Sequence, residues 1–197
     1  INENDAGEGA TQIFLYTQNA DYLFAQSTAA FEKLKLNIQE ARIFTSSHGY
    51  CMDTFTVLES SGLPVGNNPK RHKEIVTLLR EHLTLGDKAL LVPRFRQSRK
   101  EKYFAKSIEV ELINSTDKNY SMLEINCPDQ PGVLARVGKV LAMNGIKIND
   151  ARITTLGERV EDLFFVTDRY GKSIERQDLI QKLSLEITAE LESQLTH

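Results

Sequence analysis

The sequence predicts an α+β protein that contains two copies of one unit, each an antiparallel sheet with helices on one face. The first observation is an internal repeat: Ala41-Arg42-Ile43 recurs as Ala151-Arg152-Ile153, and this separation of 110 positions holds without a gap from Ile13 to Thr45. The second is that both copies show the same order of strand and helix patterns. Because repeats fix the domain count, the chain is predicted to form two small domains.

The second copy has the clearer element pattern. Its first strand is predicted to stop at Pro128, which cannot donate to a sheet, and the helix that follows is predicted to have Asp129 as its N-cap. Ser173 is the expected cap of the last helix. The predicted elements are a strand at 121–126, a helix that ends at Asn144-Gly145, two strands at 146–155 and 160–167 joined by a short hairpin, and a helix at about 175–195.

The first copy repeats this order and is predicted to continue one strand further. Its predicted elements are a strand at 12–17, a helix near 21–35, strands at 38–46 and 50–58, and a helix from Asn68-Pro69 to Gly86. Residues 107–112 then alternate between apolar and polar, so they are predicted to be the fourth strand of this copy. The second copy has no such strand after it, so its sheet either keeps three strands or receives one from elsewhere.

A β-α-β-β-α-β order builds the ferredoxin-like arrangement, an antiparallel sheet with two helices on one face. The second unit is predicted to lack the last strand. The predicted boundaries are a disordered stretch at 1–10, a first domain at 11–92, a basic connecting segment at 93–104, the fourth strand of the first domain with a link at 105–119, and a second domain at 120–197.

The strand that contains Leu163-Phe164-Phe165-Val166 is apolar on both sides, whereas a sheet with one wet face should alternate. We expect the other repeat or a second chain to cover the second face; burial by the chain's own loops is the alternative. Phe164 and Phe165 point to opposite faces, so one should enter the helix-covered core and the other a contact between units.

Composition excludes several classes of protein. No apolar run approaches the roughly 18 residues of a membrane span. The first residues have neither an initiator Met nor a signal-peptide pattern, so we interpret the chain as a fragment. Cys51 and Cys127 lack partners at metal spacing and indicate a reducing cytoplasm. A net charge of −3 gives no general attraction to nucleic acid, and the basic run at 94–102 is better interpreted as a solvated linker than as a nucleic-acid patch.

The turn after the first strand of the second copy is the best-formed polar feature. Open N–H groups at the start of a helix favour a carboxylate or phosphate, and Gly132 lets a ligand approach the backbone closely. Asp129 or Gln130 could bind the amino group of an amino acid, and Asn149 and Asp150 could reach the same region. The alternative is a capped turn without a ligand. No acid, nucleophile or metal constellation points to catalysis, so the chain looks like a sensor.

Two units with an Asp-x-Pro-Gly turn after the first strand resemble ACT domains, small modules that bind amino acids and regulate enzymes. The segment from Asn149 to Asp168 closely resembles the last ACT repeat of the bacterial bifunctional PII uridylyltransferase/uridylyl-removing enzymes. The looser first repeat and the basic link also resemble that region, so the similarity covers nearly the whole chain.

This resemblance implies a glutamine-sensing module that controls nitrogen assimilation. In that family, separate catalytic domains attach UMP to the PII signalling protein with Mg²⁺ and UTP, and remove it. The implied partners are glutamine, the catalytic domains of the same polypeptide, PII through the full-length enzyme, and a second ACT unit in a dimer. No cofactor, metal, nucleic acid or membrane partner is expected for this chain, and the expected location is the cytoplasm.

The implied ligand site comprises Asp129, Gln130, Pro131, Gly132, Val133, Leu134, Asn149 and Asp150. The first repeat departs from this pattern, because Tyr22 stands where Gly132 allows close approach. A weaker second site is therefore assigned to Asn19, Ala20, Asp21 and Tyr22. Two other functions compete: a stand-alone tandem ACT regulator that acts through protein contacts, and an RNA-binding ferredoxin-like domain. Acidic and amide residues on the first and third strands weigh against RNA, namely Glu124, Asn126, Glu161 and Asp162.

Overall fold

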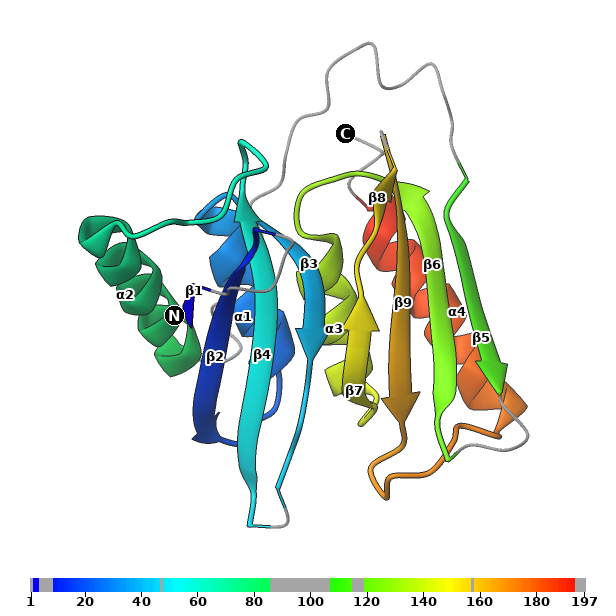
Figure 1. Cartoon of the computed structure of the whole chain (residues 1–197). Helices are drawn as coiled ribbons and strands as arrows, with labels where there is room; N and C mark the ends of the chain where they lie inside the picture. Colours follow the sequence, from blue (N-terminus) through cyan, green and yellow to red (C-terminus); the bar gives the residue numbers. More distant parts are fainter. Residues whose placement is uncertain are drawn as a thin grey trace.

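The computed structural model describes residues 2–3, 9–46, 48–85, 107–114, 119–156 and 158–193. The described strands form one antiparallel sheet in the order β1-β2-β4-β3-β7-β9-β6-β5, with β8 paired to β9. The helices cover one face of this sheet, and the two units stand side by side (Figure 1). The predicted α+β class and the two ferredoxin-like units are confirmed.

The first unit contains the elements that the sequence predicts for residues 11–92. They are β2 (Thr11–Gln18), α1 (Leu23–Lys33), β3 (Leu36–Arg42), β4 (Tyr50–Glu59) and α2 (Pro69–Leu85). The Asn68 side-chain oxygen accepts hydrogen bonds from the N–H groups of Lys70 (3.2 Å) and Arg71 (3.3 Å). This cap, with Pro69 in the first helical position, explains where α2 begins.

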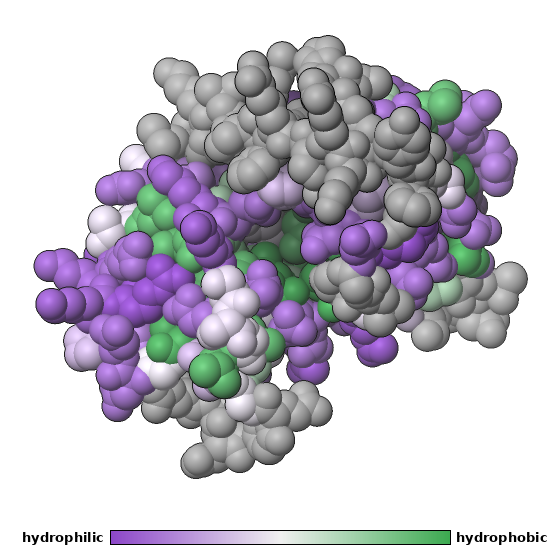
Figure 2. All heavy atoms as spheres, turned by 90° about the horizontal axis from the view of Figure 1, so that it is seen from above, coloured by the Kyte–Doolittle hydropathy of each residue, from purple (hydrophilic) through white to green (hydrophobic). Residues whose placement is uncertain are grey.

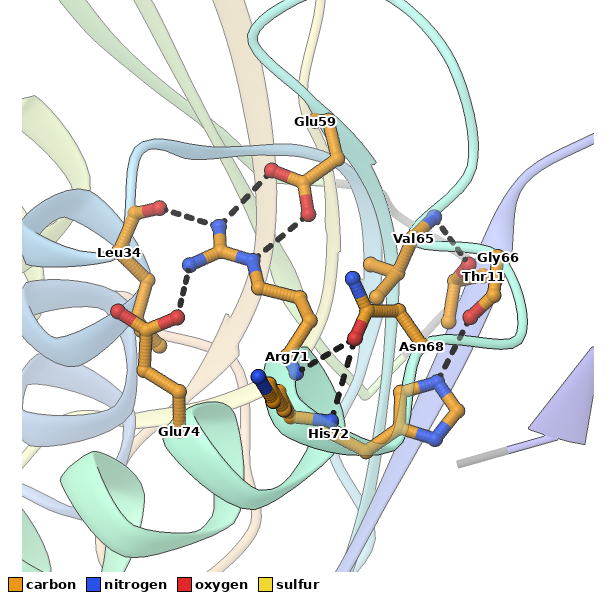
Figure 3. Close-up of polar contacts among 10 residues, drawn as sticks. Thr11, Leu34, Glu59, Val65, Gly66, Asn68, Arg71, His72 and Glu74 are labelled. Carbon is orange, nitrogen blue, oxygen red and sulfur yellow. Dashed lines mark hydrogen bonds and ion pairs between the residues drawn. The ribbon is translucent and has the colours of Figure 1, made fainter.

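Arg71 fastens α2 to the rest of the first unit (Figure 3). Its guanidinium donates to both carboxylate oxygens of Glu59 at the end of β4, each at 2.8 Å, and to the Leu34 carbonyl oxygen at 2.6 Å. A further bond reaches Glu74 at 2.9 Å. These bonds raise the pKa of Arg71, led by the Glu59 contact, so this arginine is a fully paired structural residue.

The second unit contains β6 (Ser121–Pro128), α3 (Val133–Met143), β7 (Lys147–Arg152), β8 (Thr155–Leu156), β9 (Arg159–Thr167) and α4 (Gln177–Glu192). Two predicted caps are wrong. The chain passes through the left-handed region at Gly132 (φ 78°), so α3 begins after Gly132 and Asp129 is not its cap. The chain stays extended beyond Ser173, and Arg176 is the residue that precedes α4.

The repeat is visible in side-chain contacts as well as in the order of elements. The N–H of Val65 donates to the Thr11 hydroxyl at 2.9 Å, and the N–H of Ile174 donates to the Ser121 hydroxyl at 2.8 Å. Thr11 and Ser121 are equivalent positions of the two copies, so each first strand holds the segment before its last helix in the same way.

β3 and β7 join the two units edge to edge. Ala41 pairs with Ala151, its own equivalent in the repeat, and the flanking bonds are reciprocal: Ile43 N–H to the Asn149 carbonyl (3.1 Å) and Ile153 N–H to the Gln39 carbonyl (3.3 Å). A contact in which equivalent residues meet one another is that of a two-fold dimer. The units are therefore related by a pseudo-two-fold axis between β3 and β7.

Both units share one hydrophobic core, because α1 and α3 pack against each other across the same axis. The Phe24 ring of α1 lies 6.2 Å from the Phe55 ring of its own unit and 6.1 Å from the Phe164 ring of the other. Of the described helices, none has the length and apolar character of a membrane span.

The predicted place of the fourth strand is wrong. β5 (Glu109–Asn114) pairs with β6 along its whole length, from Glu109 opposite Asn126 to Asn114 opposite Ser121. The second unit thus receives its fourth strand from the segment that precedes it. The corresponding strand beside β2 is β1 (Asn2–Glu3), so these two residues of the predicted disordered stretch are ordered. The predicted basic connecting segment, 93–104, lies outside the described residues.

The second face of the sheet is not covered by the other repeat, because the units meet through their edges. Phe164 is fully buried in the helix-covered core, as expected for one of the two phenylalanines. Phe165 lies on the opposite face, where its ring contacts Tyr120 (5.4 Å between centroids) and lies under the Arg152 guanidinium (5.9 Å). Contact of this face with a second chain stays a prediction.

Candidate functional site

The turn between β6 and α3 lies at the junction of the two units. Gly132 is buried there in the left-handed conformation, and its N–H donates at 2.8 Å to the carboxylate of Glu32, which belongs to α1 of the first unit. Figure 2 views the molecule from this end, where the described surface is mainly hydrophilic with apolar side chains between the polar ones. We call the group Glu32, Asp129, Gln130, Gly132 and Arg136 the second-turn site.

Arg136 is the cation of the second-turn site. It lies one turn into α3 and is only 3% exposed, yet its Nη1 has no hydrogen-bond partner in the described part of the chain. Burial lowers the pKa of Arg136, and the negative charges of Glu190 and Glu32 oppose that shift. Arg71 differs from Arg136, because its guanidinium is only partly buried and each of its nitrogens has a partner. The donor capacity left on Arg136 suits an anion at the turn.

Two carboxyl groups lie beside the turn. Burial raises the pKa of Asp129. Burial also raises the pKa of Asp162, on β9, to about 7, although the Thr154 N–H donates to it at 3.3 Å. The same cause, with the charge of Asp162, raises the pKa of the Cys127 thiol to about 12, so this cysteine is not an activated nucleophile.

The other predicted residues of the turn have different roles. Val133 is buried and Leu134 packs against the core, so they contribute backbone rather than side chains. The Gln130 amide donates to the Leu191 carbonyl at 3.4 Å, and its Oε1 is buried without a partner among the residues described. The turn therefore offers an N–H, a guanidinium, a carboxylate and a free amide oxygen. These groups complement the carboxylate, the ammonium and the side-chain amide of an amino acid.

Asn149 and Asp150 do not lie near this turn, contrary to the expectation that they reach the same region. In β9, Arg159 is opposite Pro128, next to the turn, and Phe165 is opposite Asp150. The turn and Asp150 are therefore about 20 Å apart along the strand. The physical reason is that α3 runs back along the sheet, so β7 begins level with the start of β6 and not with the turn that follows its end. Asn149 donates to Thr167 (3.3 Å), and Asp150 faces Arg42 of the first unit.

The first turn, Asn19 to Tyr22, lies at that opposite end. Tyr22 adopts a left-handed conformation (φ 67°, ψ 7°) close to that of Gly132 (φ 78°, ψ 14°), so the two turns share a backbone shape. The Asn19 side chain accepts a bond from the Cys51 thiol at 3.2 Å. Beside Asp21 lies a surface cavity of about 650 Å³, whose other charged lining residues are Arg169, Arg176, Asp178 and Lys182.

Sequence reasoning missed Glu32 and Arg136. Arg136 had a signal, because it follows the apolar Val133 by three positions and precedes Val140 by four, on the stripe that should face the core. Glu32 had only a weak one: in the alignment of the two copies it stands opposite Ala142. Its role depends on how the units pack, which the chain pattern does not reveal.

The structure gives two further results about function class. No group of three His, Cys, Asp or Glu side chains suited to a metal ion occurs among the described residues. The first unit does expose aromatic rings on its sheet, but Tyr16 and Tyr50 stack on each other, with centroids 5.3 Å apart and planes at 11°. Neither β2 nor β4 carries a Lys or Arg. The two strands that carry these rings therefore supply none of the cations that an RNA backbone needs, and Arg42 of the neighbouring β3 is paired with Glu40 at 3.0 Å.

Comparison with known proteins agrees with this architecture. Residues 121–171 match the ACT domain family. Over 187 residues the chain is 42% identical to the bifunctional uridylyltransferase/uridylyl-removing enzyme of Stutzerimonas stutzeri (strain A1501), an alignment that covers 95% of this chain and 21% of that enzyme. The enzyme of the same name from Pseudomonas fluorescens (strain Pf-5) is 39% identical over 184 residues, which cover 93% of this chain and 20% of the enzyme.

A solved structure, aspartate kinase from Synechocystis, superposes on 95% of this chain and 28% of its own with a TM-score of 0.50 and 13% identity. At that identity the likeness concerns the fold alone. The present chain spans about a fifth of the length of the curated enzymes that it matches. It therefore carries an ACT domain at residues 121–171 and is similar over nearly its whole length to a segment of bifunctional uridylyltransferase/uridylyl-removing enzymes.

Proposed function

We propose that this chain is the glutamine-sensing segment of a bifunctional uridylyltransferase/uridylyl-removing enzyme, and that the second-turn site binds the amino acid. The observation that carries the proposal is that one turn combines the Gly132 N–H, which already donates to a carboxylate, with the buried Arg136, whose Nη1 has no partner in the described chain. Both groups bind carboxylates, and they lie where the two ACT units meet.

The same site accounts for a preference for glutamine. The ligand's carboxylate binds the Gly132 N–H and the Arg136 guanidinium, and its ammonium binds Asp129. The unpartnered Gln130 oxygen accepts a hydrogen bond from the ligand's side-chain amide. Glutamate would place a second carboxylate beside that oxygen and beside Asp129. A site built around an amide should reject this analogue, because buried polar groups are left without partners.

The catalytic work belongs to other domains of the proposed enzyme. Those domains attach UMP to the PII signalling protein with Mg²⁺ and remove it again, in the cytoplasm. This chain would report glutamine to them by allostery, which requires that the ligand bind two states of the enzyme with different affinity. Coupling free energies of about 1–3 kcal/mol are typical, so a modest change at the junction of the ACT units suffices.

Calorimetric titration with glutamine and glutamate tests the proposal. We expect the parent chain to bind glutamine more tightly than glutamate, and Arg136→Met to lose most of this binding while staying folded, because an apolar side chain of similar length suits a buried position. The matched control is Arg80→Met, an exposed arginine on α2. Gly132→Val should also lose binding; circular dichroism must show that it is folded, since Val is strained at that φ.

Two results would contradict the proposal. Equal affinity for glutamine and glutamate would exclude a site that recognises the amide. Unchanged glutamine binding by a folded Arg136→Met variant would mean that the ligand, if it binds, binds elsewhere.

A further inference from the structure

The carboxylate receptor at the second turn already has an occupant from within the chain. Glu32, near the end of α1, accepts the Gly132 N–H at 2.8 Å across the junction between the units. Although the residue as a whole is exposed, burial at the junction raises the pKa of its carboxyl, while the Gly132 N–H and the charge of Arg136 oppose that rise. Glu32 thus satisfies the turn with the same chemical group that an amino-acid ligand would bring.

The fold itself does not require this contact. The pseudo-two-fold axis relates Gly132 to Tyr22, and both have left-handed backbones. It also relates Glu32 to Ala142, whose methyl group cannot accept a hydrogen bond. Ala142 and Asp21, the residue before Tyr22 in the first turn, both line the surface cavity at that position. The two units therefore pack in the same way with and without the carboxylate, so the Glu32 contact is a feature added to one junction.

The contact is also easy to release. Glu32 lies on the last turn of α1 and is exposed, so its side chain can swing into solvent without opening the core. The Gly132 N–H would then be left without an acceptor, and Arg136 would lose the nearby negative charge of Glu32, unless another anion arrives. A free carboxylate of similar charge exchanges for Glu32 with little change in the electrostatics of the site.

We propose that Glu32 is a built-in competitor of the ligand: its carboxylate occupies the Gly132 N–H in the ligand-free chain, and the ligand's carboxylate displaces it. The inference rests on the proposed function for the identity of the ligand. Displacement breaks a bond between α1 of one unit and the second turn of the other, so ligand occupancy is converted into a loosened junction. Because the two carboxylates compete, removing Glu32 should tighten ligand binding rather than weaken it.

The direct test is the Glu32→Ala variant, with Glu111→Ala, an exposed glutamate on β5, as the control for the loss of one charge. Glutamine titration should show tighter binding by Glu32→Ala, on the order of tenfold, as a charged hydrogen bond contributes. Glu32→Gln, which keeps an acceptor but loses the charge, should fall between this variant and the parent. Unchanged or weaker binding by Glu32→Ala overturns the proposal.

A second measurement separates the competitor from the glutamine proposal. The Gly132 amide signal in a ¹H–¹⁵N spectrum should move in Glu32→Ala, and sodium acetate should then shift it further, whereas the parent should respond little to acetate. If acetate has this effect but glutamine binds neither chain, Glu32 is a competitor for carboxylates and the glutamine assignment fails. If the Gly132 signal ignores both the variant and acetate, the competitor proposal fails.

Discussion

Two buried aspartates occupy equivalent positions in the two units, Asp53 in β4 and Asp162 in β9. Each is 1% exposed, and burial raises the pKa of each to about 7. For Asp53 the nearby Phe44 N–H opposes this rise without making a regular hydrogen bond, and for Asp162 the Thr154 N–H opposes it. A carboxyl group with this pKa is partly protonated at neutral pH, which links folding to proton binding.

We therefore expect stability to fall as pH rises. The folded-state pKa, about 7, is higher than the ordinary value of 3.8, so the folded chain binds more protons between these values and its free energy of unfolding decreases across that window. Asp162→Asn has a neutral side chain at every pH in this range. Its free energy of unfolding should therefore rise relative to that of the parent, by on the order of 1–3 kcal/mol between pH 5 and pH 8. Urea denaturation at several pH values measures the difference in free energy of unfolding, and Glu111→Gln serves as the surface control. A difference between variant and parent that stays constant with pH would contradict the prediction.

At the residue scale, sequence reasoning succeeded where a backbone rule applied and failed where packing decided. Gly132 was singled out because its missing Cβ lets a ligand approach the backbone, and the structure adds that its backbone is left-handed, a conformation that glycine adopts without strain. Asn149 and Asp150 were expected to reach the same region because they begin a neighbouring strand, and the strand register separates them from the turn. The partners Glu32 and Arg136 meet only after the units pack, so no local pattern brings them together.

At the scale of elements, the two units also approach each other closely where α1 and α3 cross. A Cβ added to Gly138 would lie 2.8 Å from Cδ1 of Phe24 and 3.3 Å from Cα of Ala25. The first distance can relax by side-chain movement, whereas the second involves backbone. The helices therefore approach to a distance that only glycine permits at this position, and this approach sets how α1 carries Glu32 to the second turn.

Gly138→Ala should destabilise the chain, although helix propensity alone predicts a gain of about 1 kcal/mol for this change. Overpacking costs about 1–3 kcal/mol, so we expect the net effect to be a loss. Thermal or urea unfolding gives the sign directly. A double-mutant cycle with Phe24→Ala should show that the loss shrinks when the ring is absent. A stabilised Gly138→Ala chain would show that the helices separate at little cost.

The order and limits of elements were largely predictable, because alternation, Pro128, Asn68-Pro69 and Asn144-Gly145 are local signals. The partner of the strand at 109–114 was not. Its alternating pattern predicts a strand but not which sheet edge receives it, and chain order suggested the first unit. The structure places it beside β6, where Val110 and Leu112 pack against the core of the second unit.

For the whole molecule, the pairing of β5 with β6 means that the sheet of each unit is completed by the segment that precedes the unit. This segment is β1 for the first unit and β5 for the second. The Asn114 amide donates to the Ile174 carbonyl at 2.9 Å, and the Ser121 hydroxyl donates to Asn114 at 2.6 Å, so β5 is tied to both β6 and the segment before α4. Among the described elements, the contacts of β5 are with β6 and α4, so this strand completes the second unit and takes no part in the junction at β3 and β7.

Cross-strand disulfides distinguish this arrangement from a fourth strand beside β2. Glu111 and Glu124 are direct partners in β5 and β6, so Glu111→Cys with Glu124→Cys should oxidise to an intramolecular disulfide, because directly opposed Cβ atoms lie about 4.5–5.5 Å apart. Glu111→Cys with Phe14→Cys, which places the second thiol on β2, should stay reduced under the same conditions. Thiol counting in denaturant gives the answer, since Cys51 and Cys127 are free in both variants. A disulfide to position 14 in place of position 124 would place β5 beside β2 and would contradict its pairing with β6.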